Sequence, residues 1–266
     1  MEQNYNMHKN KNALEKSYQA LYPFSGQYKV DFKRFLFSLN LLSEHSLIKG
    51  KKILDIGSGI GVIVSALQNL GADTTGVDRF IFPNEKQNYY SIQEFDKLNT
   101  LWKKENIKII KSDIVNEKLP FLDKIFDLVI CDATIEHLPE SPKGLFQEIH
   151  RVLKDNGAFL VTTPNLTSLL KRLRFFLLGR SPHWDIKDFF ESGSDFKGHR
   201  REFTVEEIIK MLEWSSFGII ERKTKNIFFD PKKILKPNKT TEQICCLFSW
   251  PFSNMREMIY ILAKKQ

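Results

Sequence analysis

The residues with the clearest chemical potential form a glycine-rich turn that follows a short apolar run. The turn reads Asp55-Ile-Gly57-Ser58-Gly59-Ile-Gly61. Glycines between a strand and a helix let the backbone approach a ligand at the carboxyl edge of a sheet. A dinucleotide-binding fingerprint would need a glycine where the chain has Val62. Asp55 would repel a pyrophosphate, so the turn favours a cationic ligand; the alternative is a tight turn that binds nothing.

Two more acids follow the next two predicted strands. Asp78 ends the segment 74–78, and Asp113 comes just after the segment 107–111. In a doubly wound sheet such positions face one crevice, where Asp78 can accept hydrogen bonds from ribose hydroxyls. Asp113 can accept one from an adenine amine, and Ile114 can pack on the ring. Each acid alone could be a surface turn residue, but three at successive strand ends predict a nucleoside site.

Alternating strand and helix patterns predict the elements that position these residues. Apolar runs predict strands over 52–56, 74–78, 107–111, 126–131 and 158–163, and helical spacing predicts helices over 31–45, 60–70 and 142–154. Strands that alternate with helices form a parallel sheet with right-handed crossovers. We therefore expect a doubly wound α/β fold.

This alternation breaks after residue 165. We expect a helix over 165–179, an irregular aromatic and charged loop over 181–202, and a helix over 204–213. Thr204 and Glu207 have the spacing of a capping box at the start of that last helix. Strands near 218–228 and 257–263 close the chain, and the segment 231–251 receives no assignment.

The motifs resemble those of the class I S-adenosylmethionine-dependent methyltransferases, closely over about residues 51–165 and loosely beyond. The stretch Phe126-Asp-Leu-Val-Ile-Cys-Asp-Ala-Thr-Ile-Glu136-His137-Leu138 is similar to the fourth-strand motif of the small-molecule branch. That branch includes ubiquinone-biosynthesis O-methyltransferases and sugar or glycan methyltransferases. Arg151-Val-Leu-Lys-Asp-Asn-Gly157 and Thr163-Pro164-Asn165 fit the same branch.

The resemblance implies a cofactor, its ligands and a sheet topology. The cofactor is S-adenosylmethionine. The residues implied around it are Asp55, Gly57, Ser58, Gly59 and Gly61 at the methionine end, Asp78 at the ribose, Asp113 and Ile114 at the adenine, Asp132 and Ala133 nearby, and Arg79 as a further cofactor-binding residue. The family sheet has the strand order 3-2-1-4-5-7-6 with strand 7 antiparallel. Strand 7 would be the segment 257–263, and a helical lid insertion would follow strand 5.

Two histidines are candidates for catalysis. Methyl transfer to a hydroxyl is an in-line displacement that needs alignment, exclusion of water and a base with a pKa near neutrality. His137, just after the fourth strand, is the first candidate; alternatively it makes a structural hydrogen bond or only shapes the pocket. His199 is the second, in Gly198-His-Arg-Arg-Glu-Phe-Thr204, which resembles the family segment before the last helix. Its alternative role is loop packing.

A metal is a further option at the same place. Asp132, Glu136 and His137 could gather a divalent ion if the turn after the fourth strand is helical, because positions 132 and 136 would then share a face. Some relatives in the family need magnesium. We nevertheless assign no metal to the site.

The charge of the chain is unevenly distributed. The net charge is +8; residues up to 165 include 21 basic and 20 acidic side chains, and the rest include 19 and 12. This asymmetry suggests an anionic partner, the alternative being an ordinary lysine-rich surface. Within the resembling family, amino-methylating DNA enzymes carry a proline–aromatic motif where this chain has Asp132-Ala-Thr-Ile. We therefore expect no DNA partner.

The segment 166–180 has an amphipathic pattern. Its apolar stripe consists of Leu166, Leu169, Leu170, Leu173, Phe176 and Leu177, and its basic residues include Lys171, Arg172 and Arg174. Such a helix can cover an acceptor that carries a lipid or a phosphate, or lie in a membrane interface and attract anionic lipid. The simpler alternative is a core helix with a solvated basic edge.

Composition and length favour one globular domain. Hydrophobic residues make up 42% of the chain and charged residues 27%, which is ordinary for a globular protein. We expect a single domain over 1–266: a helical cap at 1–48, a cofactor-binding core at 51–165, a lid insertion at 166–203 and a C-terminal part at 204–266. Three cysteines without a spaced pair, and the lack of a signal-peptide core or membrane-length apolar run, predict a cytoplasmic and at most membrane-peripheral protein.

These patterns lead to one functional hypothesis and two alternatives. We expect methyl transfer from S-adenosylmethionine to a hydroxyl of a small-molecule, sugar or glycan-precursor, or lipid-linked acceptor. One alternative is a binding protein that kept the cofactor loop and lost turnover. The other, an RNA methyltransferase, depends only on the basic C-terminal half.

Overall fold

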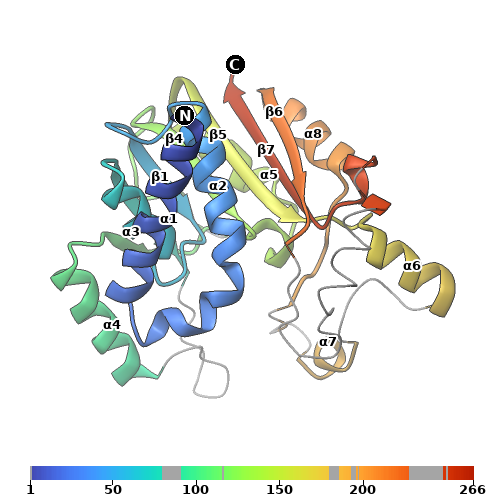
Figure 1. The fold of residues 1–266 in the computed structure, drawn as a ribbon, viewed down its shortest axis with the longest axis horizontal. Helices are drawn as coiled ribbons and strands as arrows, with labels where there is room; N and C mark the ends of the chain where they lie inside the picture. Colours follow the sequence, from blue (N-terminus) through green and yellow to red (C-terminus); the bar gives the residue numbers. More distant parts are fainter. Residues whose placement is uncertain are drawn as a thin grey trace.

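A seven-stranded sheet forms the centre of the part of the chain that the computed structural model describes, which comprises residues 2–79, 91–115, 117–179, 186–192, 196, 198–227, 248–249 and 251–266 (Figure 1). The strands are β1 Lys52–Ile56, β2 Asp73–Asp78, β3 Ile109–Lys111, β4 Phe126–Asp132, β5 Leu153–Pro164, β6 Phe217–Lys225 and β7 Met258–Lys265. Their order is β3-β2-β1-β4-β5-β7-β6, and β7 runs antiparallel to β5 and β6. The fold class and sheet order that the resemblance implies are confirmed.

Helices cover both faces of this sheet. Their bounds are α1 Glu2–Ala20, η1 Phe24–Asp31, α2 Phe32–Glu44, α3 Val62–Asn69, α4 Ile92–Lys104, η2 Ile135–His137, α5 Lys143–Val152, α6 Leu169–Leu178, α7 Ile186–Ser192, α8 Val205–Trp214 and η4 Ser253–Met255. The capping box before α8 is confirmed, because Thr204 Oγ1 accepts from the Glu207 amide at 3.2 Å and Glu207 Oε2 accepts from the Thr204 amide at 2.8 Å.

The core consists of two apolar layers, one on each side of the sheet. Successive strand residues point to opposite faces, so both faces bury apolar side chains. Ile53 and Leu128 pack in one layer with side chains from α1 to α4, whereas Leu54 and Val129 pack in the other with side chains from α5 and α8. Burial on both faces explains why the central strands read as continuous apolar runs.

The start of β5 differs from the predicted helix over 142–154. Helix α5 ends at Val152, and Leu153 already pairs with Phe126 of β4. The strand then bulges before Ala158 pairs with Leu128, and Asn156 takes a φ of 63° there. The Asn-Gly pair therefore forms a bulge inside a long strand and does not end a helix.

The region after β5 also differs from its prediction. The helix expected over 165–179 begins only at Leu169, because the buried Asn165 side chain donates from Nδ2 to the carbonyls of Asn254 and Arg256, at 2.8 Å each. Residues 186–192 form the helix α7 inside the segment expected as an irregular loop. Most of the unassigned segment 231–251, and residue 228 of the strand expected near 218–228, lie outside the described residues.

Candidate active site

The glycine turn after β1 has the backbone conformation that only glycine adopts readily. Gly57, Gly59 and Gly61 have φ values of 73°, 51° and 86°. The amides of Gly57 and Ser58 donate to the carbonyl of Val77 in β2, at 2.8 and 3.1 Å. A Cβ on Gly57 would lie 2.2 Å from Thr134 Oγ1. The turn therefore contacts the loop after β4 as closely as its backbone allows.

The acids predicted at the ends of β2 and β3 have different surroundings. Asp78 Oδ2 accepts a hydrogen bond from the Gly59 amide at 2.8 Å, which brings two predicted site residues together. Asp113 lies two residues beyond β3; its Oδ1 accepts from the Val115 amide at 3.0 Å, and its Oδ2 lies 3.2 Å from Arg79 Nε. Ile114 beside it is buried. The adenine role of Asp113 stays a prediction.

Two buried carboxyl groups lie behind the glycine turn. Asp55 pairs with Ile130 in the sheet, and Asp132 ends the neighbouring strand β4. Burial, with the charges of Asp132 and Asp78, raises the pKa of Asp55 well above its usual value, and Arg34 offsets this only in part. Ser58 Oγ is buried and has no hydrogen-bond partner among the described residues. Buried acids beside an unpartnered hydroxyl suit a cationic, hydrogen-bonding ligand.

Arg34 of α2 is a site residue that the sequence reasoning missed. Its Nη1 is bonded to Asp132 Oδ1 across 98 positions of the chain, and its Nη2 lies 3.0 Å from Asp31 Oδ1. Although burial disfavours the charged form, these two acids raise the pKa of Arg34 above its usual value. Arg34 and Ser38 occupy i and i+4 positions within an otherwise apolar helix face, and that polar pair was the available signal.

Tyr28 is a second residue that the sequence reasoning missed. It belongs to η1, the short helix between α1 and α2, and its Oη lies 3.1 Å from where a Cβ on Gly59 would stand. The N-terminal segment thus approaches Gly59, the same residue whose amide donates to Asp78. No spacing rule in the sequence indicates this contact, because a single tyrosine in a turn carries no pattern.

The two histidines predicted for catalysis lie together. His137, in η2, is exposed, and its ring packs edge-to-face on that of His199 with the centroids 4.8 Å apart. His137 Nδ1 lies 3.2 Å from the Gly198 carbonyl oxygen, and His199 Nδ1 lies 2.8 Å from Glu202 Oε1. Although burial favours neutral Glu202, His199 and Lys171 hold the pKa of this carboxyl below its usual value.

The group that could hold a metal differs from the predicted one. Ligating atoms of Glu136, His137 and His199 all lie within 4.8 Å of one another. Glu136 is buried; its Oε2 accepts from Thr163 Oγ1 at 3.0 Å, and its Oε1 has no hydrogen-bond partner in the described part of the chain. Asp132 does not join them, because Ala133 takes a φ of 51° and a 3-10 turn follows in place of an α-helix.

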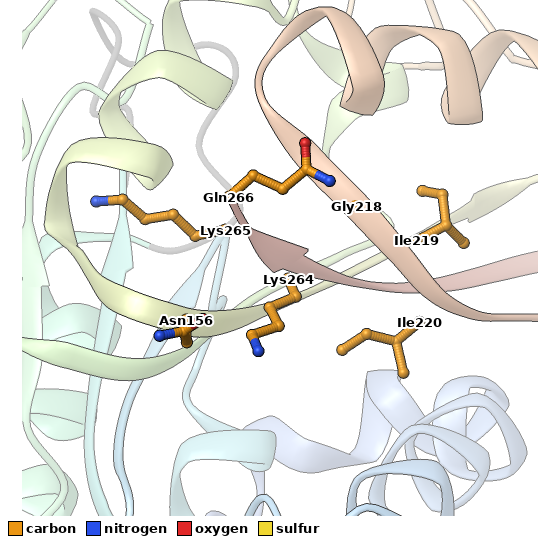
Figure 2. A pocket seen from close by; sticks show the side chains of 7 residues that line it. All are labelled: Asn156, Gly218, Ile219, Ile220, Lys264, Lys265 and Gln266. Atoms are coloured by element: carbon orange, nitrogen blue, oxygen red, sulfur yellow. The ribbon is translucent and has the colours of Figure 1, made fainter.

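A cavity outside this site lies at the opposite end of the strands, away from the carboxyl ends of the parallel strands. This pocket has a volume of about 340 Å³ and is lined by Asn156 of β5, the residues 218–220 of β6 and the residues 264–266; Figure 2 labels these residues. These positions are at the start of β5 and β6 and at the end of the antiparallel β7. The pocket is therefore not the crevice at the carboxyl ends of the strands, where the predicted cofactor residues lie.

Comparisons with known proteins give relatives that are described as methyltransferases. The chain is 28% identical over 127 residues to a ubiquinone biosynthesis O-methyltransferase of Pseudomonas syringae pv. tomato, covering 48% of this chain and 50% of that protein. A protein of the same description from Actinobacillus pleuropneumoniae is 29% identical over 130 residues, covering 49% and 52%. The chain spans about half the length of these relatives.

Solved structures of methyltransferases share the fold. An S-adenosylmethionine-dependent methyltransferase from Mesorhizobium loti superposes with a TM-score of 0.54 at 17% identity, covering 89% of this chain and 98% of that one. One from Archaeoglobus fulgidus gives 0.54 at 20% identity, covering 92% and 100%. The fold, the matching family and the relatives together define a class I S-adenosylmethionine-dependent methyltransferase. A sequence profile described as a methyltransferase domain matches residues 31–221, and the chain belongs to that family.

The family implies S-adenosylmethionine as cofactor, and the residues at the carboxyl edge fit it. Asp55 and Asp132 place buried carboxyl groups near the glycine turn, and Ser58 offers an unsatisfied hydroxyl. The glycines let the backbone of the turn lie where a Cβ would meet Thr134, Tyr28 or Ile109. These residues would hold the cationic methionine end, with Asp78 at the ribose.

Within the described residues, every helix is too short or too polar to cross a bilayer.

We expect Gly59→Val to abolish S-adenosylmethionine binding. The φ of 51° is strained for a branched residue, and the new Cβ would meet Tyr28 Oη at 3.1 Å. Isothermal titration of the folded variant measures the loss. Gly50→Val is the matched control, because Gly50 has a φ of 71° but no atom within 4 Å of its Cβ position. Unchanged affinity in folded Gly59→Val would contradict the placement of the cofactor.

We expect Asp55→Asn to stabilise the cofactor-free protein and to weaken cofactor binding. The folded-state pKa of Asp55 is raised, so wild-type stability falls as pH rises through that pKa, whereas asparagine avoids this loss. The gain in thermal midpoint should be larger at pH 8 than at pH 5. Affinity should fall about 10- to 100-fold, the usual effect of losing a hydrogen bond to a charged group. A variant that is less stable at pH 8 and binds normally would contradict both roles.

We expect Arg34→Met to lower the free energy of unfolding by about 3–5 kcal/mol, because Asp132 would stay buried without its cation. Urea unfolding at neutral pH measures the change. Combining Arg34→Met with Asp132→Asn should restore part of the loss. If the double variant lost as much as the two single variants together, the pair would not be coupled.

Proposed function

We propose that this protein transfers a methyl group from S-adenosylmethionine to a hydroxyl oxygen of a small-molecule, sugar or glycan-precursor, or lipid-linked acceptor. The observation that carries the proposal is the pair His137 and His199 at the carboxyl edge of the sheet, with Glu202 behind His199. The relatives described as ubiquinone biosynthesis O-methyltransferases support an oxygen acceptor. A cytoplasmic location stays a prediction.

The hydrogen bonds of the two histidines support different roles for them. If His137 Nδ1 donates to the Gly198 carbonyl, its Nε2 bears the lone pair that a general base needs. Glu202 accepts from His199 Nδ1 and orients that ring against His137. His137 would therefore remove the proton of the acceptor hydroxyl, and His199 would position it. When bound, S-adenosylmethionine supplies a methyl group on an electrophilic sulfonium, and the protein adds alignment and exclusion of water to the action of the base.

We expect His137→Gln to lower turnover by roughly 10²- to 10⁴-fold and to leave cofactor affinity nearly unchanged. The wild-type rate should rise with pH through one ionisation near neutrality, and the variant should lose this rise. Acceptors are found by incubating the protein and S-adenosylmethionine with fractionated metabolites and lipids, and searching by mass spectrometry for products heavier by one methylene.

His199→Gln is the matched control for that experiment. If His199 is a positioning residue, His199→Gln should slow turnover less than His137→Gln does and should leave the pH dependence in place. Should His199→Gln remove the pH dependence and His137→Gln retain it, the base would be His199. A protein that binds S-adenosylmethionine and methylates none of the fractions would contradict the proposed function in favour of a binding role.

A further inference from the structure

Helix α6 exposes its apolar side chains and buries a charged one. In α6, all of whose residues are described, the buried side chain is that of Lys171. The exposed fractions are 65% for Phe175, 85% for Phe176, 67% for Leu177 and 58% for Leu178. These four residues form the apolar tip of the helix. The core-helix alternative from the sequence is wrong, because α6 buries Lys171 while Leu173, Phe176 and Leu177 of the expected apolar stripe are exposed.

The inverted orientation of α6 has a specific cause. Lys171 Nζ is bonded to the buried carboxylate of Glu202 and donates to the Asn165 carbonyl at 3.2 Å. Neighbouring Arg172 donates from Nε to the Thr167 carbonyl at 2.7 Å. These bonds hold the first turn of α6 against the protein, so the rest of the helix projects beyond the carboxyl end of β5 (Figure 1).

The apolar tip exposes four consecutive large apolar side chains to solvent. Four consecutive exposed apolar residues cover nearly every side of the last helical turn, and apolar side chains all around a helix indicate a non-aqueous environment. Helix α7, at the same end of the molecule in Figure 1, adds Ile186 and Phe190 with exposed fractions of 79% and 84%. Water is therefore an unfavourable environment for this end of the protein.

The charge around the apolar tip indicates what covers it. The segment 166–180 contains no acidic residue, and besides the buried Lys171 it has three arginines. The half-buried Arg174 directly precedes the tip, and the exposed Arg172 lies about one helical turn before it. A short helix with apolar side chains at its end and arginines at its flank matches a bilayer interface, where acyl chains receive the former and anionic headgroups the latter.

We propose that the apolar tip of α6 inserts into the headgroup region of a membrane that contains anionic lipid. The inference depends on the exposure and charge of α6 and not on the proposed reaction, so it can fail while that reaction stands. It assigns to α6 a docking role in which Lys171 and Glu202 fix the angle of the helix.

Vesicle flotation of the full chain tests the proposal. Wild-type protein should float with phosphatidylcholine vesicles that contain phosphatidylglycerol, and binding should weaken as salt is raised. The double variant Phe175→Ser and Phe176→Ser should bind on the order of tenfold or more weakly, since two large apolar side chains no longer leave water. Its thermal midpoint should not change, because both side chains are exposed.

Controls on the same fold make the result specific. Leu122→Ser and Trp214→Ser remove apolar residues that are 78% and 79% exposed elsewhere on the surface, and vesicle binding should persist in both. A second set of vesicles contains phosphatidylcholine alone. Wild-type protein that floats with neither set of vesicles, or equally with both, overturns the proposal. A second result would also overturn it. The wild-type protein would be a dimer in analytical ultracentrifugation and bind no vesicles, and the double variant would be a monomer.

Discussion

The buried ion pair between Arg34 and Asp132 is the interaction on which the rest of the site depends. Two carboxyl groups, Asp55 and Asp132, lie inside the protein on adjacent strands, and two uncompensated buried charges would destabilise the fold. Arg34 supplies a cation from α2, and the hydroxyls of Thr162 and Ser38 also bond to Asp132. The pair fastens the N-terminal helices over the carboxyl edge of the sheet while leaving Asp55 with a raised pKa.

That arrangement gives the two acids different tasks. Asp132 is satisfied within the protein and serves as the attachment point of α2. Burial and the neighbouring charges disfavour the ionised form of Asp55. A cationic ligand beside Asp55 would therefore gain the most favourable electrostatic interaction. A protein that fully neutralised both acids internally would be more stable and less able to bind a sulfonium and an ammonium group. The site therefore keeps some electrostatic strain that the ligand relieves.

A second buried pair connects the proposed membrane surface to the histidines. Glu202 receives Lys171 of α6 on one oxygen and His199 on the other, and His199 packs on His137. The helix that carries the apolar tip and the ring that positions the proposed base thus share one carboxylate. This geometry supports a link between surface and site without requiring a moving part.

The sequence by itself determined the sheet, the glycine turn and the acids at the strand ends. Those features follow local rules: apolar runs form buried strands, glycines permit the positive φ of the turn, and parallel strands end at one edge. Tertiary structure alone decided the partners. Arg34 meets Asp132 across 98 positions, and His137 meets Gly198 across 61, and no periodicity encodes either contact. The orientation of α6 was likewise undecided, because an amphipathic pattern defines two faces but not which one the protein buries. One buried carboxylate, Glu202, turned the lysine inward and left the phenylalanines outside.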